Sequence, residues 1–600
     1  MSAALIYRIV PSQPQAHLFS VSCTLATPAP QGQVFRLPTW IPGSYLIREF
    51  ARNIVRVWAF CGEAPLAVEK IAKDAWRVAP CAGPLILRYE VYAWDLSVRA
   101  AHLDQTHGFF TGSSVFLCPE GFDTAACEVA VLPPEGEAYA RWRVATALPR
   151  LDAPEYGFGR YQAENYDALI DHPVEMGEFT LTRFEAHGVP HDVAITGRQR
   201  CDLARLSNDL RRICEWQIDF FGRPAPMDRY VFQIMAVGEG YGGLEHRAST
   251  SLICSREDLP HPRMERMSEE YRGFLGLASH EYFHTWNVKR IKPAAFVPYD
   301  LSRENYTRLL WVFEGFTSYY DDLALLRCGL IDADSYLELL GRAVSNVLRG
   351  SGRLKQSVAD SSFDAWIKYY RQDENAPNAV VSYYAKGALV GWLLDLHLRR
   401  ASATSLDELM RALWQRHGHS GTGVPEDGVR RLAEDISGLD LGGFFADYVY
   451  GTEELPLAEV CADFALRFNL RAAEGPGDKG GRPGKNGVGK VALGAKLSPG
   501  ADAKLAHVFD QGAAQRAGLS AGDLIIAVGG LRATSANLDN LLQAERGQDS
   551  VEVIAFRRDE LMRFELPLLL APFDTCWIEL DDHAEPAAIA RRDLWLGTAG

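Results

Sequence analysis

The chain has 600 residues, of which 47% are hydrophobic, so it is long and apolar enough to form several domains with sizeable cores. Its formal net charge is −15 at pH 7, from 62 Lys and Arg against 77 Asp and Glu. This charge argues against nucleic acid or an anionic membrane as a partner. No apolar run approaches the length of about 18 residues that a membrane span needs.

The cysteines and the N-terminus both favour a cytoplasmic protein. Eleven cysteines are scattered along the chain without CxxC pairs, which suits reduced thiols better than a disulfide framework. Residues 1–10 place no basic segment before their apolar residues, so we expect no signal peptide.

Residues 1–180 are predicted to be all-β, because short runs of alternating polarity, such as residues 85–92, are broken by Pro and Gly. Residues 230–237 also predict a strand. Four glycines follow between residues 238 and 243, where they let a backbone approach a substrate closely. Glu245 follows two residues after the last of them, and on an ordinary edge strand it would be a solvated surface acid.

The sequence His280-Glu281-Tyr282-Phe283-His284 is the strongest functional signal. Two histidines four positions apart on a helix lie on one face, so both imidazoles can reach a single Zn²⁺. Glu281 is then placed to take a proton from a water at the metal. Residues 271–288 contain no proline and predict the required helix, which the cap residue Ser268 would begin. The alternative is a core helix that carries two hydrogen-bonded histidines.

A catalytic zinc needs a third protein ligand and an open position for water. Glu314 lies within residues 311–320, which predict a second helix that is buried almost all round and ends near Gly329. A carboxylate among aromatic side chains is costly unless it is paired or bound to a metal. Glu314 is therefore the expected third ligand, with a salt-bridged helix residue as the alternative.

The chain becomes increasingly helical from residue 181 to residue 460, with helical periods at 323–328, 335–348 and 388–399. Residues 474–490 then contain seven glycines in seventeen positions, which predicts a flexible loop or linker.

Several of these motifs carry a family resemblance. The HExxH segment, followed by Glu-Gly-Phe-Thr-Ser-Tyr at 314–319, resembles the gluzincin aminopeptidases related to aminopeptidase N and leukotriene hydrolase. The long gap between the second histidine and the glutamate is closer to the bacterial glycyl aminopeptidase family, which has a C-terminal PDZ domain. Residues 40–49 resemble the N-terminal signature of that family. The resemblance covers almost the whole chain.

Two further motifs bear on the catalytic roles. Residues 242–246 resemble the Gly-x-Met-Glu-Asn exopeptidase motif, although Leu244 and His246 replace its Met and Asn. By this resemblance Glu245 binds the ammonium group of the substrate. Residues 384–387 resemble the Tyr-x-Lys-Gly segment, which implies that Tyr384 donates a hydrogen bond to the oxyanion. The adjacent Tyr383 remains an alternative donor. Glu281 is expected to act as general base and then as general acid.

The resemblance implies a multidomain α+β fold with an N-terminal β-sandwich-like domain (1–180), a thermolysin-like catalytic domain with a helical part (181–460) and a PDZ domain with a C-terminal tail (461–600). Residues 514–530 resemble the helix-to-strand segment of a PDZ domain. Such a domain binds a C-terminal peptide by adding a strand, or else packs on the catalytic domain as a structural element. The carboxylate-loop candidates are Leu493, Gly494, Ala495 and Lys496.

We therefore expect a zinc aminopeptidase with one Zn²⁺ per chain, which cleaves peptides with a free N-terminus and prefers Gly and Ala by resemblance. The rival hypotheses are a zinc endopeptidase with the same metal site and an inactive PDZ scaffold. Co²⁺ or Mn²⁺ in place of zinc remains open.

Overall fold

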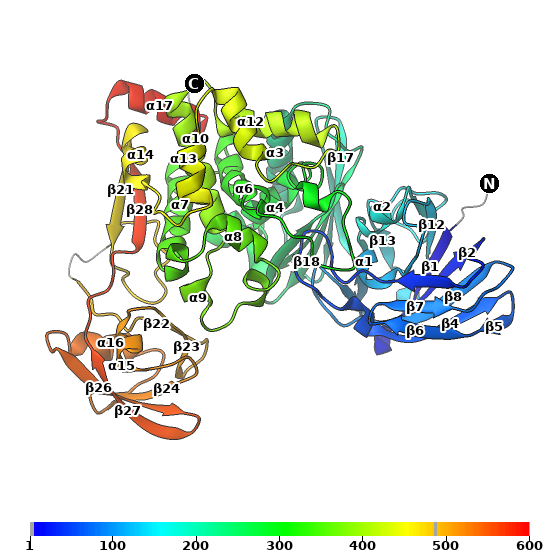
Figure 1. The fold of residues 1–600 in the computed structure, drawn as a ribbon, viewed down its shortest axis with the longest axis horizontal. Coiled ribbons are helices and arrows are strands. Elements are labelled where there is room, and N and C mark those ends of the chain that lie inside the picture. The colour runs from blue at the N-terminus through cyan, green and yellow to red at the C-terminus, as the bar shows by residue number, and fades with distance from the viewer. Residues whose placement is uncertain (1–4, 485–488, 599–600) are drawn as a thin grey trace. The chain divides into compact units, whose positions relative to one another are not determined.

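The computed structural model describes residues 5–484 and 489–598, which form a multidomain α+β protein (Figure 1). The chain divides into two compact units. The first unit comprises the chain up to Asn305 together with Trp414–Gly423. The second unit comprises Tyr306–Leu413 and the chain from Val424 onward. The described residues include no helix that is both long and apolar enough to cross a membrane.

The first unit begins with a β-rich region, as predicted, although two short helices, α1 (Gly112–Val115) and α2 (Tyr166–Ile170), interrupt the strands. Strand β1 shows why its sequence forms a sheet, since Leu5, Tyr7 and Ile9 are buried while the residues between them are more exposed. The largest sheet has the order β14 (Gly159–Ala163), β12 (Cys127–Val131), β1 (Leu5–Gln13), β2 (Leu18–Leu25), β8 (Leu85–Tyr92), β4 (Ile54–Cys61), β5 (Ala64–Leu66).

Two smaller sheets complete this region. The first has the order β13 (Arg143–Ala145), β15 (Val174–Gly177), β10 (His107–Phe110), β9 (Ala101–Leu103). The second has the order β11 (Cys118–Pro119), β3 (Gln33–Arg36), β7 (Ala75–Val78), β6 (Val68–Ala72).

A separate five-stranded sheet supports the candidate site. Helix α4 (Glu269–Phe283) contacts its edge strand β19 and the neighbouring strand β20, and α3 (Leu203–Phe221) packs against both α4 and β16. Strand β19 pairs on one side only, because it lies at the end of the sheet. The order is β16 (Thr180–Ala186), β17 (Val189–Thr196), β18 (Tyr230–Val237), β20 (Ser249–Ser255), β19 (Tyr241–Glu245).

The second unit is mostly helical over its first half. The predicted helices at 335–348 and 388–399 are present as α7 and α10, but the helix predicted over 311–329 is divided at Glu314 into α5 and α6. The helices are α5 (Leu310–Phe313), α6 (Gly315–Arg327), α7 (Ala333–Leu348), α8 (Val358–Phe363), α9 (Ala376–Ala379), α10 (Ala385–Ala401), α11 (Leu406–Leu413), α12 (Gly428–Ser437), α13 (Gly442–Phe444) and α14 (Leu457–Asp463).

The C-terminal part of this unit contains two sheets. Strands β21 (Leu466–Arg471) and β28 (Thr575–Leu580) pair with each other, and β28 packs on α7 (Figure 1). The chain between them forms a second sheet with its own apolar core. Its order is β22 (Ala495–Leu497), β23 (Ala503–Val508), β24 (Leu524–Val528), β26 (Ser550–Arg557), β27 (Glu560–Pro567), with β25 (Leu531–Arg532) beside β24 and the helices α15 (Ala513–Ala517) and α16 (Leu538–Ala544).

The glycine-rich segment makes hydrogen bonds at its start, over its described part. The Asp478 carboxylate accepts hydrogen bonds from the Arg471 guanidinium and from the backbone N–H groups of Glu474 and Gly480. These contacts involve a partly buried ion pair at the start of the segment, and the flexibility of residues 474–490 stays a prediction. Residues 485–488 of the predicted loop lie outside the described residues.

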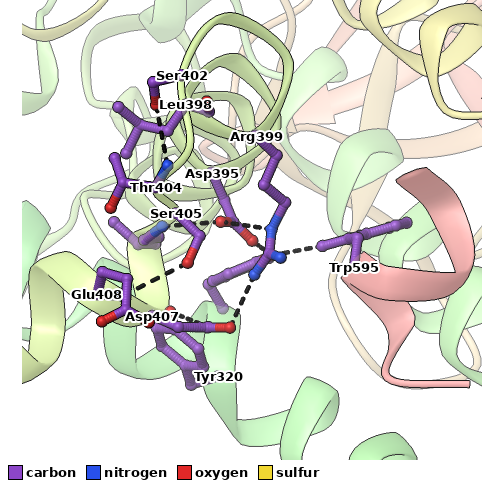
Figure 2. Close-up of polar contacts among 12 residues, drawn as sticks. Tyr320, Asp395, Leu398, Arg399, Ser402, Thr404, Ser405, Asp407, Glu408 and Trp595 are labelled. Atoms are coloured by element: carbon purple, nitrogen blue, oxygen red, sulfur yellow. Dashed lines mark hydrogen bonds and ion pairs between the residues drawn. The ribbon is translucent and has the colours of Figure 1, made fainter. Parts of the chain in front are cut away.

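A buried ion-pair network attaches the C-terminal helix α17 (Pro586–Leu596) to the helical region (Figure 2). Asp407 accepts hydrogen bonds from the guanidinium groups of Arg327, at 3.0 and 3.1 Å, and Arg399, at 2.7 Å. Arg327 also donates to the backbone oxygen of Trp595 at 2.6 Å, and the Trp595 indole N–H donates to the Tyr319 hydroxyl at 2.7 Å. Asp407 therefore holds the cation that anchors the last helix.

Asp407→Asn should lower the free energy of unfolding by about 3 kcal/mol at pH 7, because it leaves two buried guanidinium groups without their shared carboxylate. Burial alone would raise the pKa of Asp407, but Arg327 and Arg399 outweigh it and lower this pKa to about 2. The carboxylate's contribution is thus present above about pH 4 and is lost as the pH falls towards 2. Urea unfolding of wild type and Asp407→Asn at pH 7 and pH 3 measures this loss of stability. The control is Asp447→Asn, because the Asp447 side chain is exposed. An equal difference between Asp407→Asn and wild type at both pH values would contradict it.

Candidate active site

Helix α4 presents the HExxH residues of the first unit. The helix begins at a true cap, since the Ser268 hydroxyl accepts a hydrogen bond from the Tyr271 N–H at 3.1 Å. Gln217 on α3 fixes the orientation of α4 about its axis. Its side-chain amide donates hydrogen bonds to the backbone oxygen and the hydroxyl of Ser279, at 2.9 and 3.0 Å. The residue after Ser279 is His280, so this contact lies directly beside the candidate metal ligands.

The helix ends at His284, several residues earlier than predicted, and this early end organises the second histidine. In the turns that follow the helix, the backbone oxygen of Asn287 lies 2.6 Å from Nδ1 of His284. A carbonyl oxygen only accepts hydrogen bonds, so Nδ1 carries the hydrogen and Nε2 keeps its lone pair in the neutral ring.

The two histidines fit a zinc ion. Nε2 of His284 lies 3.0 Å from Nε2 of His280. Two nitrogens bound at about 2.0–2.1 Å to one tetrahedral zinc would lie only slightly further apart, at about 3.3 Å. The hydrogen bond from His284 to a backbone carbonyl is also the support that zinc-binding histidines usually have.

Glu281 is buried beside the histidines, with 5% of its surface exposed. Burial raises the pKa of Glu281 to about 7, opposed by His280 and reinforced by Glu245. Its Oε2 atom has no hydrogen-bond partner within the described part of the chain. A Cβ atom on Gly243 of β19 would overlap the carboxylate. This explains why a glycine is needed at position 243, as the sequence suggested in general terms.

Glu245, at the end of β19, lies beside Glu281. Carboxylate oxygens of both residues and a ring nitrogen of His284 all lie within 4.8 Å of one another. Glu245 is 3% exposed, and its Oε1 atom has no hydrogen-bond partner among residues 5–484 and 489–598. The structure thus brings together four of the predicted site residues, and it buries two carboxylates within reach of each other.

Gly43 lies directly against the Glu245 carboxylate. Its φ is +95°, and a Cβ atom at this position would lie 2.5 Å from both carboxylate oxygens of Glu245. Sequence reasoning quoted residues 40–49 as a signature but gave Gly43 no role. Its glycine–glutamate contact joins the β-rich region to the end of β19, and only the three-dimensional structure reveals it.

His246, which departs from the exopeptidase motif, lies in a buried network with Asp171. Its Nδ1 atom lies 3.5 Å from the Asp171 carboxylate, which also binds the ammonium group of Lys289 at 2.6 Å. Burial lowers the pKa of His246. This buried network holds the residue that follows Glu245, so His246 helps to fix the strand end.

Glu314 and the tyrosines belong to the second unit. Glu314 is 2% exposed and lies at the break between α5 and α6. The next residue, Gly315, packs against Gly387 of α10, where a Cβ on Gly315 would lie 2.6 Å from the Gly387 carbonyl carbon. This glycine contact brings together the helix ends that carry Glu314 and Tyr384.

Tyr384 is the more accessible of the two candidate tyrosines. Tyr383 is fully buried, and its pKa is raised well above the ordinary value by burial and then by the nearby Tyr370 and Glu314. Tyr384 is half-buried, and its hydroxyl lies 3.2 Å from that of Tyr370. Sequence reasoning missed Tyr370, which no local motif distinguishes from a core aromatic residue.

The predicted carboxylate-loop residues lie at the edge of the C-terminal sheet. Ala495 and Lys496 belong to β22, the end strand, and Leu493 and Gly494 precede it. Gly494 has a φ of +72° and packs against Gly512, with its missing Cβ 2.6 Å from the Gly512 Cα.

Comparisons with known proteins show which family the chain belongs to. The chain matches the Peptidase M61 N-terminal domain over residues 6–178 and the M61 glycyl aminopeptidase domain over residues 273–390. The crystal structure of an aminopeptidase N family protein from Idiomarina loihiensis is 41% identical, with a TM-score of 0.95, over 99% of this chain and 100% of that chain. The chain belongs to the aminopeptidase N family.

This family member is a peptidase, a hydrolase that acts on peptide bonds. An M1 zinc metallopeptidase from Deinococcus radiodurans is 14% identical, with a TM-score of 0.49, over 76% of this chain and 94% of that one. A search of curated proteins found no match. The M61 segment at 273–390 includes the HExxH residues, Glu314 and Tyr384 of this aminopeptidase N family chain.

Gly243→Ala should lower the peptidase activity about 100-fold while the protein still folds, because the new methyl group displaces the Glu281 carboxylate. Hydrolysis rates and thermal melting measure the two effects separately. Gly273→Ala is the matched control, since a Cβ there meets nothing within 4 Å on the same helix that carries Glu281. Equal activity of the two variants would show that the contact does not position Glu281.

Proposed function

We propose that this peptidase is a zinc aminopeptidase in which His280, His284 and Glu314 bind the metal. The observation that carries the proposal is the pair of Nε2 atoms 3.0 Å apart beside two buried carboxylates. Glu314 supplies a buried oxygen donor on the same M61 segment as the histidines. The descriptions of both the M61 domain and the relative name an aminopeptidase.

Bound zinc would supply a Lewis acid that polarises the scissile carbonyl and favours ionisation of water. Glu281 accepts the proton of the attacking water and passes it to the leaving amine. Its buried position beside the two histidines and its Oε2 atom, which has no hydrogen-bond partner within the described residues, suit this role. Tyr384 donates a hydrogen bond to the oxyanion, with the buried Tyr383 as the alternative donor.

Glu245 makes the enzyme an exopeptidase in this proposal. Its buried Oε1 atom lacks a hydrogen-bond partner within the described residues, so a substrate ammonium group would satisfy it. Binding the terminus there also sets the register, since it places the first peptide bond next to the histidines. The substrates are peptides with a free N-terminus. The glycyl aminopeptidase match supports a preference for Gly, and the proposal extends it to Ala as the next smallest residue.

The domain roles follow the same proposal. Residues 181–460 form a thermolysin-like catalytic domain, and residues 461–600 form a PDZ domain after the β-rich residues 1–180. The end strand β22 supports addition of a C-terminal peptide at Leu493, Gly494, Ala495 and Lys496.

Glu281→Gln should keep its zinc but lower turnover about 10²- to 10⁴-fold, because it removes the proton acceptor and no metal ligand. Metal analysis and hydrolysis of Gly-, Ala- and Leu-anilides measure both effects. Wild type should cleave these anilides but not N-acetyl-Gly-anilide. Equal cleavage of the acetylated substrate would establish an endopeptidase, and wild type without zinc or turnover would favour the scaffold hypothesis.

Glu245→Gln should raise the KM for Ala-anilide by 10-fold or more, since a neutral amide cannot pair with the substrate ammonium. Steady-state kinetics measure the effect beside Glu239→Gln, an exposed carboxylate in the loop that leads into β19. If both variants have the KM of wild type, the ammonium group binds elsewhere.

A further inference from the structure

A single arginine from the β-rich region reaches the strand that carries Glu245. Arg99 lies on the connection between β8 and β9, and its Nη2 atom donates a hydrogen bond to the backbone oxygen of Gly243 at 3.1 Å. Its Nη1 atom lies 3.9 Å from where a Cβ on Gly242 would be. The guanidinium therefore lies against the glycine segment of β19.

The positive charge of Arg99 has no carboxylate partner. Over the described ranges, no Asp or Glu oxygen lies within 4.0 Å of its guanidinium nitrogens, and its buried Nε–H group has no hydrogen-bond partner. Glu281 lies within electrostatic reach but forms no ion pair with it. A guanidinium has five N–H donors in a planar fork that matches a carboxylate. An arginine whose role was only to support a backbone oxygen would leave this buried Nε–H group without a purpose.

The loop that carries Arg99 is itself held in place. The Arg99 backbone N–H donates to the Ser97 hydroxyl at 3.3 Å, and the Thr111 hydroxyl donates to the Arg99 backbone oxygen at 3.5 Å. The side chain thus extends from a supported backbone, which reduces the entropy lost when a ligand binds.

The spacing along β19 relates Arg99 to the proposed ammonium site. Gly242 and Gly243 precede Glu245 by three and two residues, which corresponds to about 7–10 Å along a strand. Strand β19 is at the end of its sheet and can accept an extended peptide. A peptide bound with its ammonium group at Glu245 would reach Arg99 with its second or third residue.

We propose that Arg99 binds the C-terminal carboxylate of di- and tripeptides, so that this peptidase recognises both termini of short substrates. This inference rests on the proposed aminopeptidase function and on Glu245 as the ammonium site. It makes short peptides with free carboxylates the preferred substrate class, because a longer chain extends past the guanidinium.

The test compares Ala-Ala, Ala-Ala-Ala and an alanine pentapeptide with their C-terminal amides. Wild type should prefer the free acid over the amide by about 10- to 100-fold in kcat/KM for the two short peptides, as expected for a charged hydrogen bond. The preference should be close to 1 for the pentapeptide. In Arg99→Gln the acid-to-amide ratio should fall close to 1 at every length, and in Arg99→Lys it should be intermediate.

The control is Arg56→Gln, whose side chain is 68% exposed in the same β-rich region and which should keep the wild-type ratio. An acid-to-amide ratio near 1 in wild type overturns the proposal even if Arg99 variants fail to fold. A wild-type ratio in folded Arg99→Gln overturns it as well. Failure of the aminopeptidase function is distinct, because wild type would then release no N-terminal alanine from any of these peptides.

Discussion

Two buried carboxylates that lie close together dominate the chemistry of this protein. Glu245 and Glu281 have oxygens within 4.8 Å of each other, and each has an oxygen without a hydrogen-bond partner in the described structure. Burying charges in this way is costly unless cations compensate them. In the proposed function, a metal ion and a substrate ammonium group would supply this positive charge.

Close backbone contacts hold the two carboxylates in their buried positions. Gly43 and Gly243 leave room for the two carboxylates, where any other residue would clash. Gln217 fixes helix α4 through Ser279, and Asn287 fixes the ring of His284. Each support comes from a different segment, so the β-rich region and the five-stranded sheet both contribute to one site. A scaffold of this kind holds reactive groups in place before the substrate arrives.

The sequence predicted the features that depend on local spacing. The HExxH residues lie on a helix with a serine cap, as expected, and the predicted family resemblance is confirmed for the M61 segments and for aminopeptidase N. The PDZ assignment, the domain boundaries and the catalytic roles of individual residues stay predictions. The N-terminal region is β-rich rather than all-β, because Gly112–Val115 and Tyr166–Ile170 form short helices.

Features that depend on contacts between distant segments could not be predicted. The helix break at Glu314 and the early end of α4 each determine where one functional side chain lies. The spacing of apolar residues does not predict where a helix breaks or ends. The contact between Gly43 and Glu245 joins residues about 200 positions apart, and Arg99 reaches Gly243 across 144 positions. No local pattern marks Arg99, and the signature at residues 40–49 does not reveal the role of Gly43, since both contacts depend on how distant segments pack.

Anomalous diffraction at the zinc edge, from crystals grown with zinc and an alanine-based amine inhibitor, tests the central claim most directly. We expect one zinc peak bonded to Nε2 of His280 and His284 and to a Glu314 oxygen, with the inhibitor ammonium group on Glu245. A zinc peak elsewhere, or an inhibitor that binds without contact to Glu245, would contradict the account.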